Sequence, residues 1–123
     1  MDKIIKKINN KSVRVGIVGL GYVGLPLLKS FIQSNIEVIG FDIDKEKIKK
    51  LKKKQSYIKH IDLSFLKKFK NFHFTHDFKE ISNVDIIILC LPTPLNKRKK
   101  PDLTFISNTM KMIIEFLKVD QCI

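Results

Sequence analysis

The feature that most constrains this chain is a set of three glycines, Gly19, Gly21 and Gly24, that directly follows the apolar segment Val13 to Val18. The segment is short and rich in β-branched residues, which predicts a buried parallel strand. After the glycines, apolar side chains recur at helical spacing, and Pro26 falls in the first turn, where its missing N–H costs little. The pattern predicts a strand, a tight turn and a helix in immediate succession.

Each glycine has its own mechanical role in such a turn. Gly19 permits the tight turn out of the strand, Gly21 lets a pyrophosphate approach the backbone, and Gly24 lets the helix pack close to the sheet. The free N–H groups at the start of the helix would face the phosphates. We therefore expect the phosphate-binding residues of a dinucleotide site to be Gly19, Gly21, Tyr22, Val23 and Gly24.

A carboxylate stands where a ribose-binding group belongs. The second predicted strand, Glu37 to Phe41, ends at Asp42, which lies 18 positions after Gly24. Asp42 would accept hydrogen bonds from the ribose hydroxyls of NAD and would repel the 2′-phosphate of NADP. A turn or cap role for Asp42 is the alternative, but Asp44 already supplies the N-cap of the next helix. Lys47 is expected about one helical turn away and could reach the same ribose.

The remainder of the chain alternates helices and strands. The helix after Asp44, with Ile43 and Ile48 as an expected hydrophobic staple, contains seven lysines within ten residues, which a solvated helix face explains well. The continuous apolar run from Val84 to Leu91 predicts a strand buried on both faces. The other expected elements are a short helix around 63–69, a strand at 72–75, a helical turn at 78–81, a helix capped by Asp102 with its apolar stripe along 103–117, and the opening of another strand at 119–123.

This alternation predicts the α/β class, with a Rossmann-type doubly wound parallel sheet in the spatial order 3-2-1-4. We expect the fold to be truncated after the helix that follows the fourth strand, with the fifth strand missing. Residues 1–12 form a basic N-terminal extension, and residues 13–123 form the NAD-binding domain, incomplete at its C-terminus. The open edge of the fourth strand would favour self-association of the chain, unless the loop at Lys97 to Pro101 closes it.

The net charge of +12, from 24 basic and 12 acidic residues, raises nucleic-acid binding as an alternative. Only Arg14 and Arg98 among the basic residues are arginine, whereas forked contacts to phosphates and bases favour arginine. We therefore predict no nucleic-acid partner. No apolar run approaches the about 20 residues that span a bilayer, and the N-terminus lacks the apolar core of a signal peptide, so no membrane partner is expected.

Cysteine and histidine usage points to no metal site. Cys90 and Cys122 have no paired spacing, which fits a reducing cytoplasm. His73 and His76 are spaced for a metal pair on a helix, but the predicted strand there places them differently, and no cysteine or carboxylate partner is evident. We expect surface histidines and a cytoplasmic location.

Three separated motifs give the chain a family resemblance. The run from Gly19 to Pro26 (GLGYVGLP) resembles the signature of the UDP-glucose/GDP-mannose dehydrogenase family, and Phe41 to Asp44 with Lys47 resembles its ribose-binding turn. Cys90 to Leu95 (CLPTPL) resembles the loop after its fourth strand, and Pro101 to Leu103 the start of its next helix. The resemblance implies that Pro92 and Thr93 help to hold NAD.

Members of that family oxidise the C6 alcohol of a nucleotide sugar to a carboxylate with two NAD, and they supply uronic acids for surface polysaccharides. Within the family, Ser56 to Ile58 and Cys90 to Leu95 look most like the branch acting on UDP-N-acetyl-hexosamines. The resemblance places the catalytic cysteine and the sugar-binding residues in later segments, so neither cysteine here is expected to act in catalysis. The UDP-sugar, which could be UDP-N-acetylglucosamine, UDP-N-acetylmannosamine or UDP-glucose, would be a partner only of the full-length parent, and this chain alone would be inactive. A stand-alone NAD-binding module without catalysis is the other interpretation.

Overall fold

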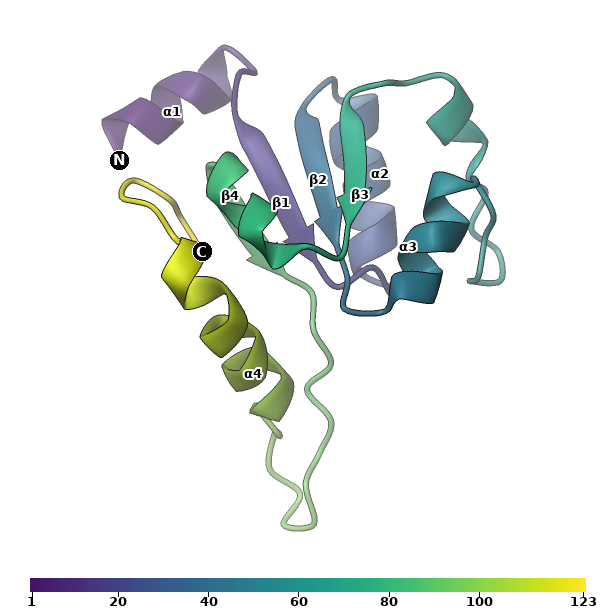
Figure 1. The fold of residues 1–123 in the computed structure, drawn as a ribbon, viewed down its shortest axis with the longest axis vertical. Helices are drawn as coiled ribbons and strands as arrows, with labels where there is room; N and C mark the ends of the chain where they lie inside the picture. The colour runs from purple at the N-terminus through teal and green to yellow at the C-terminus, as the bar shows by residue number, and fades with distance from the viewer.

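A computed structural model describes residues 1–123. Its centre is a four-stranded parallel sheet in the order β3-β2-β1-β4 (Figure 1). The predicted Rossmann-type class and the strand order 3-2-1-4 are therefore confirmed. The strands are β1 (Arg14–Val18), β2 (Glu37–Phe41), β3 (Phe72–Thr75) and β4 (Ile86–Leu89).

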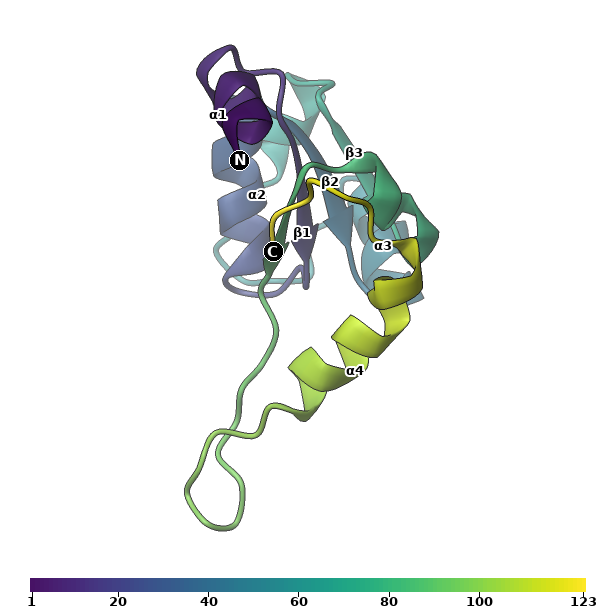
Figure 2. The ribbon, with the colours of Figure 1, turned by 90° about the vertical axis from the view of Figure 1, so that its left-hand side faces the viewer.

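Helices cover both faces of this sheet. Figure 2 shows α2 and α4 on opposite sides of the strands. One core cluster joins the sheet to α2, α3 and η1, and the other joins it to η2 and α4. None of the helices combines the length and the hydrophobicity that a membrane span requires. The helices are α1 (Asp2–Asn9), α2 (Gly24–Gln33), α3 (Lys45–Lys52) and α4 (Thr104–Ile113), and the 3-10 turns are η1 (Ser64–Lys67), η2 (Phe78–Asn83) and η3 (Ile114–Phe116).

The start of α3 agrees with the sequence in one respect and differs in another. Asp44 is the N-cap, and its carboxylate accepts the N–H groups of Glu46 at 2.9 Å and Lys47 at 3.3 Å. The expected hydrophobic staple is wrong, because Ile43 is 67% exposed while Ile48 is buried in the core. The turn that bonds the Asp44 N–H back to Asp42 directs Ile43 outward.

The fourth strand is shorter and less covered than the apolar run at 84–91 suggests. Only Ile87 of the four strand residues is buried, although the strand packs against both core clusters, so the expectation of burial on both faces holds only in part. The reason is that β4 stands at the edge of the sheet, where β1 is its one ladder partner.

The outer side of β4 meets one short segment. Cys122 forms a single parallel bridge to Ile86, and it is the only residue of 119–123 in a β-bridge, so the strand expected there is limited to one position. Its N–H donates to the Asp85 carbonyl at 3.0 Å, and its carbonyl accepts from the Ile87 N–H at 2.8 Å. The loop after β4 does not close this edge, because it pairs with itself through Leu95 and Pro101.

The helix after this loop begins one residue later than expected. Leu103 is the N-cap of α4, and Asp102 precedes it and accepts the Thr104 N–H at 2.9 Å. Of the predicted apolar stripe, Ile113 is buried, but Leu103 and Ile114 are more than half exposed.

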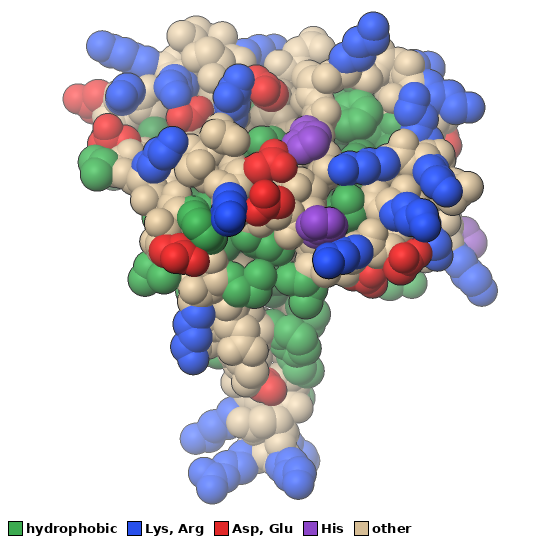
Figure 3. All heavy atoms as spheres, in the orientation of Figure 1, with side chains coloured by type: hydrophobic (Ala, Val, Ile, Leu, Met, Phe, Trp, Pro, Cys, Tyr) green, Lys and Arg blue, Asp and Glu red, His purple; other side chains and the backbone are tan.

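Figure 3 shows the surface of the face seen in Figure 1. Hydrophobic side chains gather in the lower middle of this view, while lysine and arginine side chains are spread over the upper part and the loop at the bottom.

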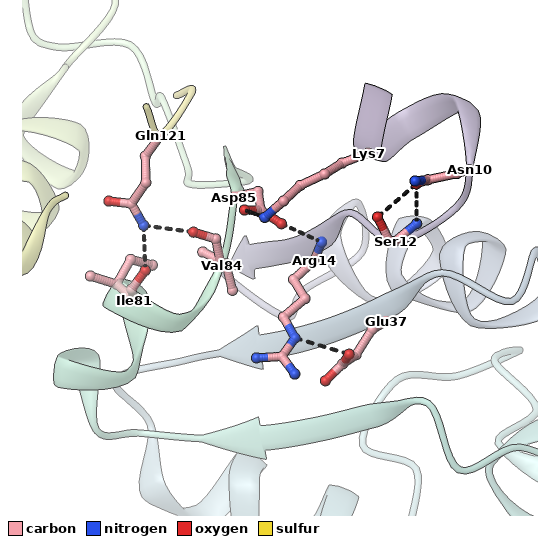
Figure 4. A network of polar contacts seen from close by, with 9 residues as sticks. All are labelled: Lys7, Asn10, Ser12, Arg14, Glu37, Ile81, Val84, Asp85 and Gln121. Atoms are coloured by element: carbon pink, nitrogen blue, oxygen red, sulfur yellow. Dashed lines mark hydrogen bonds and ion pairs between the residues drawn. The ribbon is translucent and has the colours of Figure 1, made fainter. Parts of the chain in front are cut away.

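Residues 1–12 contain a helix that is tied to the sheet. The Lys7 ammonium donates to one oxygen of the Asp85 carboxylate, and the Arg14 N–H donates to the other at 2.9 Å (Figure 4). On the other side of the segment that leads into β4, the Gln121 amide donates to the carbonyls of Ile81 and Val84. The amino end of β4 is therefore fixed from both flanks by side-chain hydrogen bonds.

Candidate functional site: a dinucleotide cleft

A cleft of about 680 Å³ opens at the carboxyl ends of β1, β2 and β4. The chain leaves β1 toward one face of the sheet and β4 toward the other, and ligands of open α/β sheets bind at such a switch point. The expected site residues that line the cleft are Gly19, Gly21, Tyr22, Val23, Asp42, Lys47 and Pro92. A second hollow of about 530 Å³ lies at the opposite, amino ends of β1 and β2.

Steric contacts require glycine at two of the three glycine positions of the turn. Gly19 has a φ of +96°, and a Cβ there would lie 2.3 Å from the Cys90 carbonyl oxygen. A Cβ on Gly24 would lie 1.7 Å from the Gly19 carbonyl oxygen. A Cβ on Gly21 would meet nothing within 4 Å, so the fold itself tolerates a side chain there. Gly21 therefore keeps the cleft open without being needed for packing.

Four consecutive N–H groups on this turn, those of residues 21–24, have no acceptor in the chain. The turn leads directly into α2, whose first N–H groups lack intrahelical partners as in every helix. The preceding N–H groups, by contrast, are paired, since Gly19 donates to the Phe41 carbonyl and Leu20 to the Asp42 carboxylate. Such a row of free donors at a helix N-terminus suits the oxygens of a pyrophosphate.

Asp42 connects this turn to the second strand. Its side chain is almost fully buried, with one carboxylate oxygen accepting the Leu20 N–H at 3.0 Å and the other accepting the Asp44 N–H at 2.9 Å. The Lys47 ammonium lies 3.9 Å from the carboxylate. An ionised carboxylate has about four lone-pair sites, so acceptor capacity is left for the ribose hydroxyls. The structure shows the structural role of Asp42, which bonds the glycine turn to the start of α3, and its contact with the ribose stays a prediction.

Tyr57 contacts residues of the site, although its place there was not predicted from the sequence. Its hydroxyl donates to the Leu20 carbonyl, and its ring lies 5.7 Å from the Lys47 ammonium. Burial raises the pKa of this phenol, and the negative charges of Asp42 and Asp44 raise it further. The sequence signal was the segment Ser56 to Ile58, whose family resemblance pointed to the sugar and not to the cofactor.

The other wall of the cleft comes from α4. Phe105 and Thr109 line it, and Thr109 is buried although it is polar. A threonine inside the apolar stripe of a helix is the signal that could have indicated this. Pro92 lies in the cleft, whereas Thr93 is exposed and outside its lining, so the contact between Thr93 and NAD stays a prediction.

Neither cysteine is arranged as a nucleophile. Cys90 lines the cleft, and burial raises the pKa of its thiol, which disfavours the reactive thiolate. Cys122 is exposed on the bridge beside β4. His73 lies on β3 and faces Glu80, with 3.1 Å between the imidazole and the carboxylate.

A parallel sheet, a glycine turn with free N–H groups and a carboxylate at the end of the second strand together define an NAD-binding Rossmann domain. The chain belongs to the UDP-glucose/GDP-mannose dehydrogenase family, because the NAD-binding domain of that family matches residues 13–123.

Named relatives agree with this assignment. The chain is 34% identical over 108 residues to a UDP-N-acetyl-D-glucosamine 6-dehydrogenase of Pseudomonas aeruginosa, which covers 88% of this chain and 25% of that protein. It is 38% identical over 92 residues to the enzyme of the same name from Salmonella typhi, covering 75% of this chain and 21% of that protein. The UDP-D-ManNAc dehydrogenase structure from Pyrococcus horikoshii is similar with a TM-score of 0.78 and 28% identity, over 88% of this chain and 27% of that one. The chain therefore spans about a quarter of the length of these relatives.

Proposed function

We propose that this chain is the NAD-binding portion of a nucleotide-sugar 6-dehydrogenase whose substrate is a UDP-N-acetyl-hexosamine. The similar proteins named above are UDP-N-acetyl-hexosamine dehydrogenases, which supports this choice of substrate. Membership of the family supports the reaction, oxidation of the C6 alcohol to a carboxylate. The observation that carries the cofactor site is the Asp42 carboxylate bonded to the glycine turn at the mouth of the cleft. NAD held there would accept a hydride from the sugar.

The residues of the cleft divide between the parts of the cofactor. The free N–H groups of Gly21, Tyr22, Val23 and Gly24 would bind the pyrophosphate, and the positive φ of Gly19 shapes the turn that presents them. Asp42 would accept the ribose hydroxyls, with Lys47 beside it. Pro92 and Thr93 would approach the nicotinamide end from the loop after β4.

Titration of the chain with NADH and NADPH by calorimetry tests the assignment of Asp42. We expect tighter binding of NADH, because the buried carboxylate repels the 2′-phosphate of NADPH. Asp42→Asn should reduce the affinity for NADH and narrow the difference between the two cofactors. Equal affinities of the unaltered chain, or tighter binding of NADPH, would refute the assignment.

We further propose that the chain alone oxidises no UDP-sugar. Covalent oxidation to the acid needs a reactive cysteine, and the raised pKa of the Cys90 thiol and the remote position of Cys122 do not supply one. NADH production from UDP-N-acetylglucosamine by the purified 123-residue chain would contradict this proposal.

The cellular setting is also part of the proposal. We place the protein in the cytoplasm because both cysteines are free thiols and the substrate and cofactor are cytoplasmic metabolites. The basic residues are almost all lysine, with Arg14 and Arg98 the two arginines, so we propose no nucleic-acid partner. A strongly salt-dependent affinity for DNA or RNA, without affinity for NADH, would argue for the opposite assignment.

A further inference from the structure

Leu20, in the middle of the glycine turn, is held at both of its backbone polar groups. Its N–H donates to Asp42, and its carbonyl accepts from the Tyr57 hydroxyl. Its side chain is fully buried in the core. The residue therefore cannot rotate without breaking two hydrogen bonds and exposing apolar surface.

The Leu20 carbonyl belongs to the same peptide unit as the Gly21 N–H. In a trans peptide these two groups point in opposite directions, and no peptide bond of the chain is cis. A hydroxyl that holds the carbonyl toward Tyr57 therefore turns the Gly21 N–H the other way. That N–H has no acceptor in the chain, and the space beside Gly21 is open.

The ring of Tyr57 reaches the other half of the site. The Lys47 ammonium lies 5.7 Å from the ring centroid, within the range of a cation–π contact, and 3.9 Å from the Asp42 carboxylate. One side chain thus touches both the turn that faces the pyrophosphate and the lysine beside the ribose carboxylate. Tyr57 itself does not line the cleft.

We propose that Tyr57 is a positioning residue of the cofactor site, which orients the Leu20–Gly21 peptide so that the Gly21 N–H is presented to the pyrophosphate. This inference rests on the proposed cofactor binding in the cleft. The hydroxyl is half-buried and its pKa is raised, so it stays protonated and can donate at neutral pH. The segment that carries Tyr57 therefore contributes to binding although it contacts no part of the cofactor.

The test is the variant Tyr57→Phe, which removes one hydroxyl and keeps the ring over Lys47. Three probes are titrated into the unaltered chain and the variant: NADH, ADP and adenosine, the last without phosphates. The expected result is a loss of roughly three- to tenfold in affinity for NADH and for ADP, the size of one lost hydrogen bond, with adenosine unchanged.

The matched control is Asn71→Leu. Asn71 also donates side-chain N–H groups to backbone carbonyls, those of Ile32 in α2 at 3.0 Å and Ile36 after it at 2.8 Å, but it lies outside the cleft. We expect it to lower the melting temperature without changing any of the three affinities. Melting curves of both variants establish that the protein is folded at the temperature of the titrations.

Three outcomes of the variants would overturn the inference. Unchanged affinity of Tyr57→Phe for ADP would show that the hydroxyl does not set the pyrophosphate site. An equal loss for adenosine and ADP, or an equal loss in Asn71→Leu, would show a general structural effect instead. If the unaltered chain binds neither NADH nor ADP, the proposed function fails and the inference falls with it.

Discussion

Gly24 lies so close to Gly19 that a Cβ built on it would come within 1.7 Å of the Gly19 carbonyl oxygen. Neither backbone can move away cheaply, because the Gly19 N–H is bonded to the Phe41 carbonyl at 2.8 Å and Gly24 begins α2. The close packing of the strand, the turn and the helix therefore requires that residue 24 has no Cβ. Gly21, in the same turn, has no such neighbour.

The same chemical change at these two glycines should have opposite effects. Gly24→Ala is expected to destabilise the fold by about 3 kcal/mol through overpacking. Gly21→Ala is expected to change the free energy of unfolding by about 0.5 kcal/mol or less, as at open surface positions, but to weaken NADH binding at least about tenfold, because the methyl group occupies the approach of the pyrophosphate. Urea unfolding and calorimetric titration measure the two quantities. Wild-type affinity in Gly21→Ala would mean that the pyrophosphate lies elsewhere.

The contact between Lys7 and Asp85 should appear in the acid stability of the chain. Burial raises the pKa of Asp85, but hydrogen bonds from Lys7 and the Arg14 N–H, with the positive charges of both residues, outweigh it and lower the pKa. A lowered pKa gives stability that is present above the unfolded value of about 3.9 and is lost as the pH falls through the folded value. Lys7→Met should reduce stability at neutral pH by about 1 kcal/mol and flatten this acid loss.

The matched control for this prediction is Lys6→Met, on the same helix with the same change of charge. Lys6 has no ion pair in the structure, so its removal should leave the acid transition in place. Stability against pH, followed by circular dichroism during urea unfolding, measures both variants. Identical pH profiles for the two would mean that Lys7 does not hold Asp85 in solution.

Tyr57 predicts a loss of stability at alkaline pH. Its pKa is raised in the folded chain, so above the unfolded value of about 10 the unfolded chain releases a proton that the folded chain retains. Folding stability must then fall as the pH rises. Tyr57→Phe removes this contribution, and its melting temperature should decline less steeply than that of the unaltered chain between about pH 10 and 11. Parallel declines would place the phenol in solvent.

The edge of the sheet predicts self-association of the 123-residue chain. Only a single bridge to Cys122 lies along the outer side of β4, and α4 and its flanking residues expose apolar side chains. Unpaired edges of this kind pair with other chains. Sedimentation velocity at tens of micromolar should show concentration-dependent species, and added salt should strengthen them, since it screens the repulsion of the +12 charge. A monomer at every concentration would show that the edge is protected. The exposed apolar residues are Phe105 and Met112 on this helix and Leu103 and Ile114 directly before and after it.

Most of the fold followed from local patterns. The glycine spacing, the β-branched runs and the cap at Asp44 each act within a few residues of chain, so the strands, α2 and α3 could be predicted closely. Even the strand order was predictable, because the handedness of parallel crossovers leaves few arrangements open. The degree of burial of β4 was not predictable, since burial depends on what packs against the strand from outside its own segment.

The site likewise has parts that the local sequence predicts and parts that depend on tertiary contacts. The sequence by itself determined the glycine turn and the carboxylate of Asp42, because a dinucleotide demands small residues and an acceptor at set distances along one βαβ unit. Only the tertiary structure decided that Tyr57 holds the Leu20 carbonyl, 37 positions away, and that Thr109 closes the far wall of the cleft. Those contacts join segments with no local pattern in common. They exist because the packed core brings the segments together, and this proximity cannot be read from either segment alone.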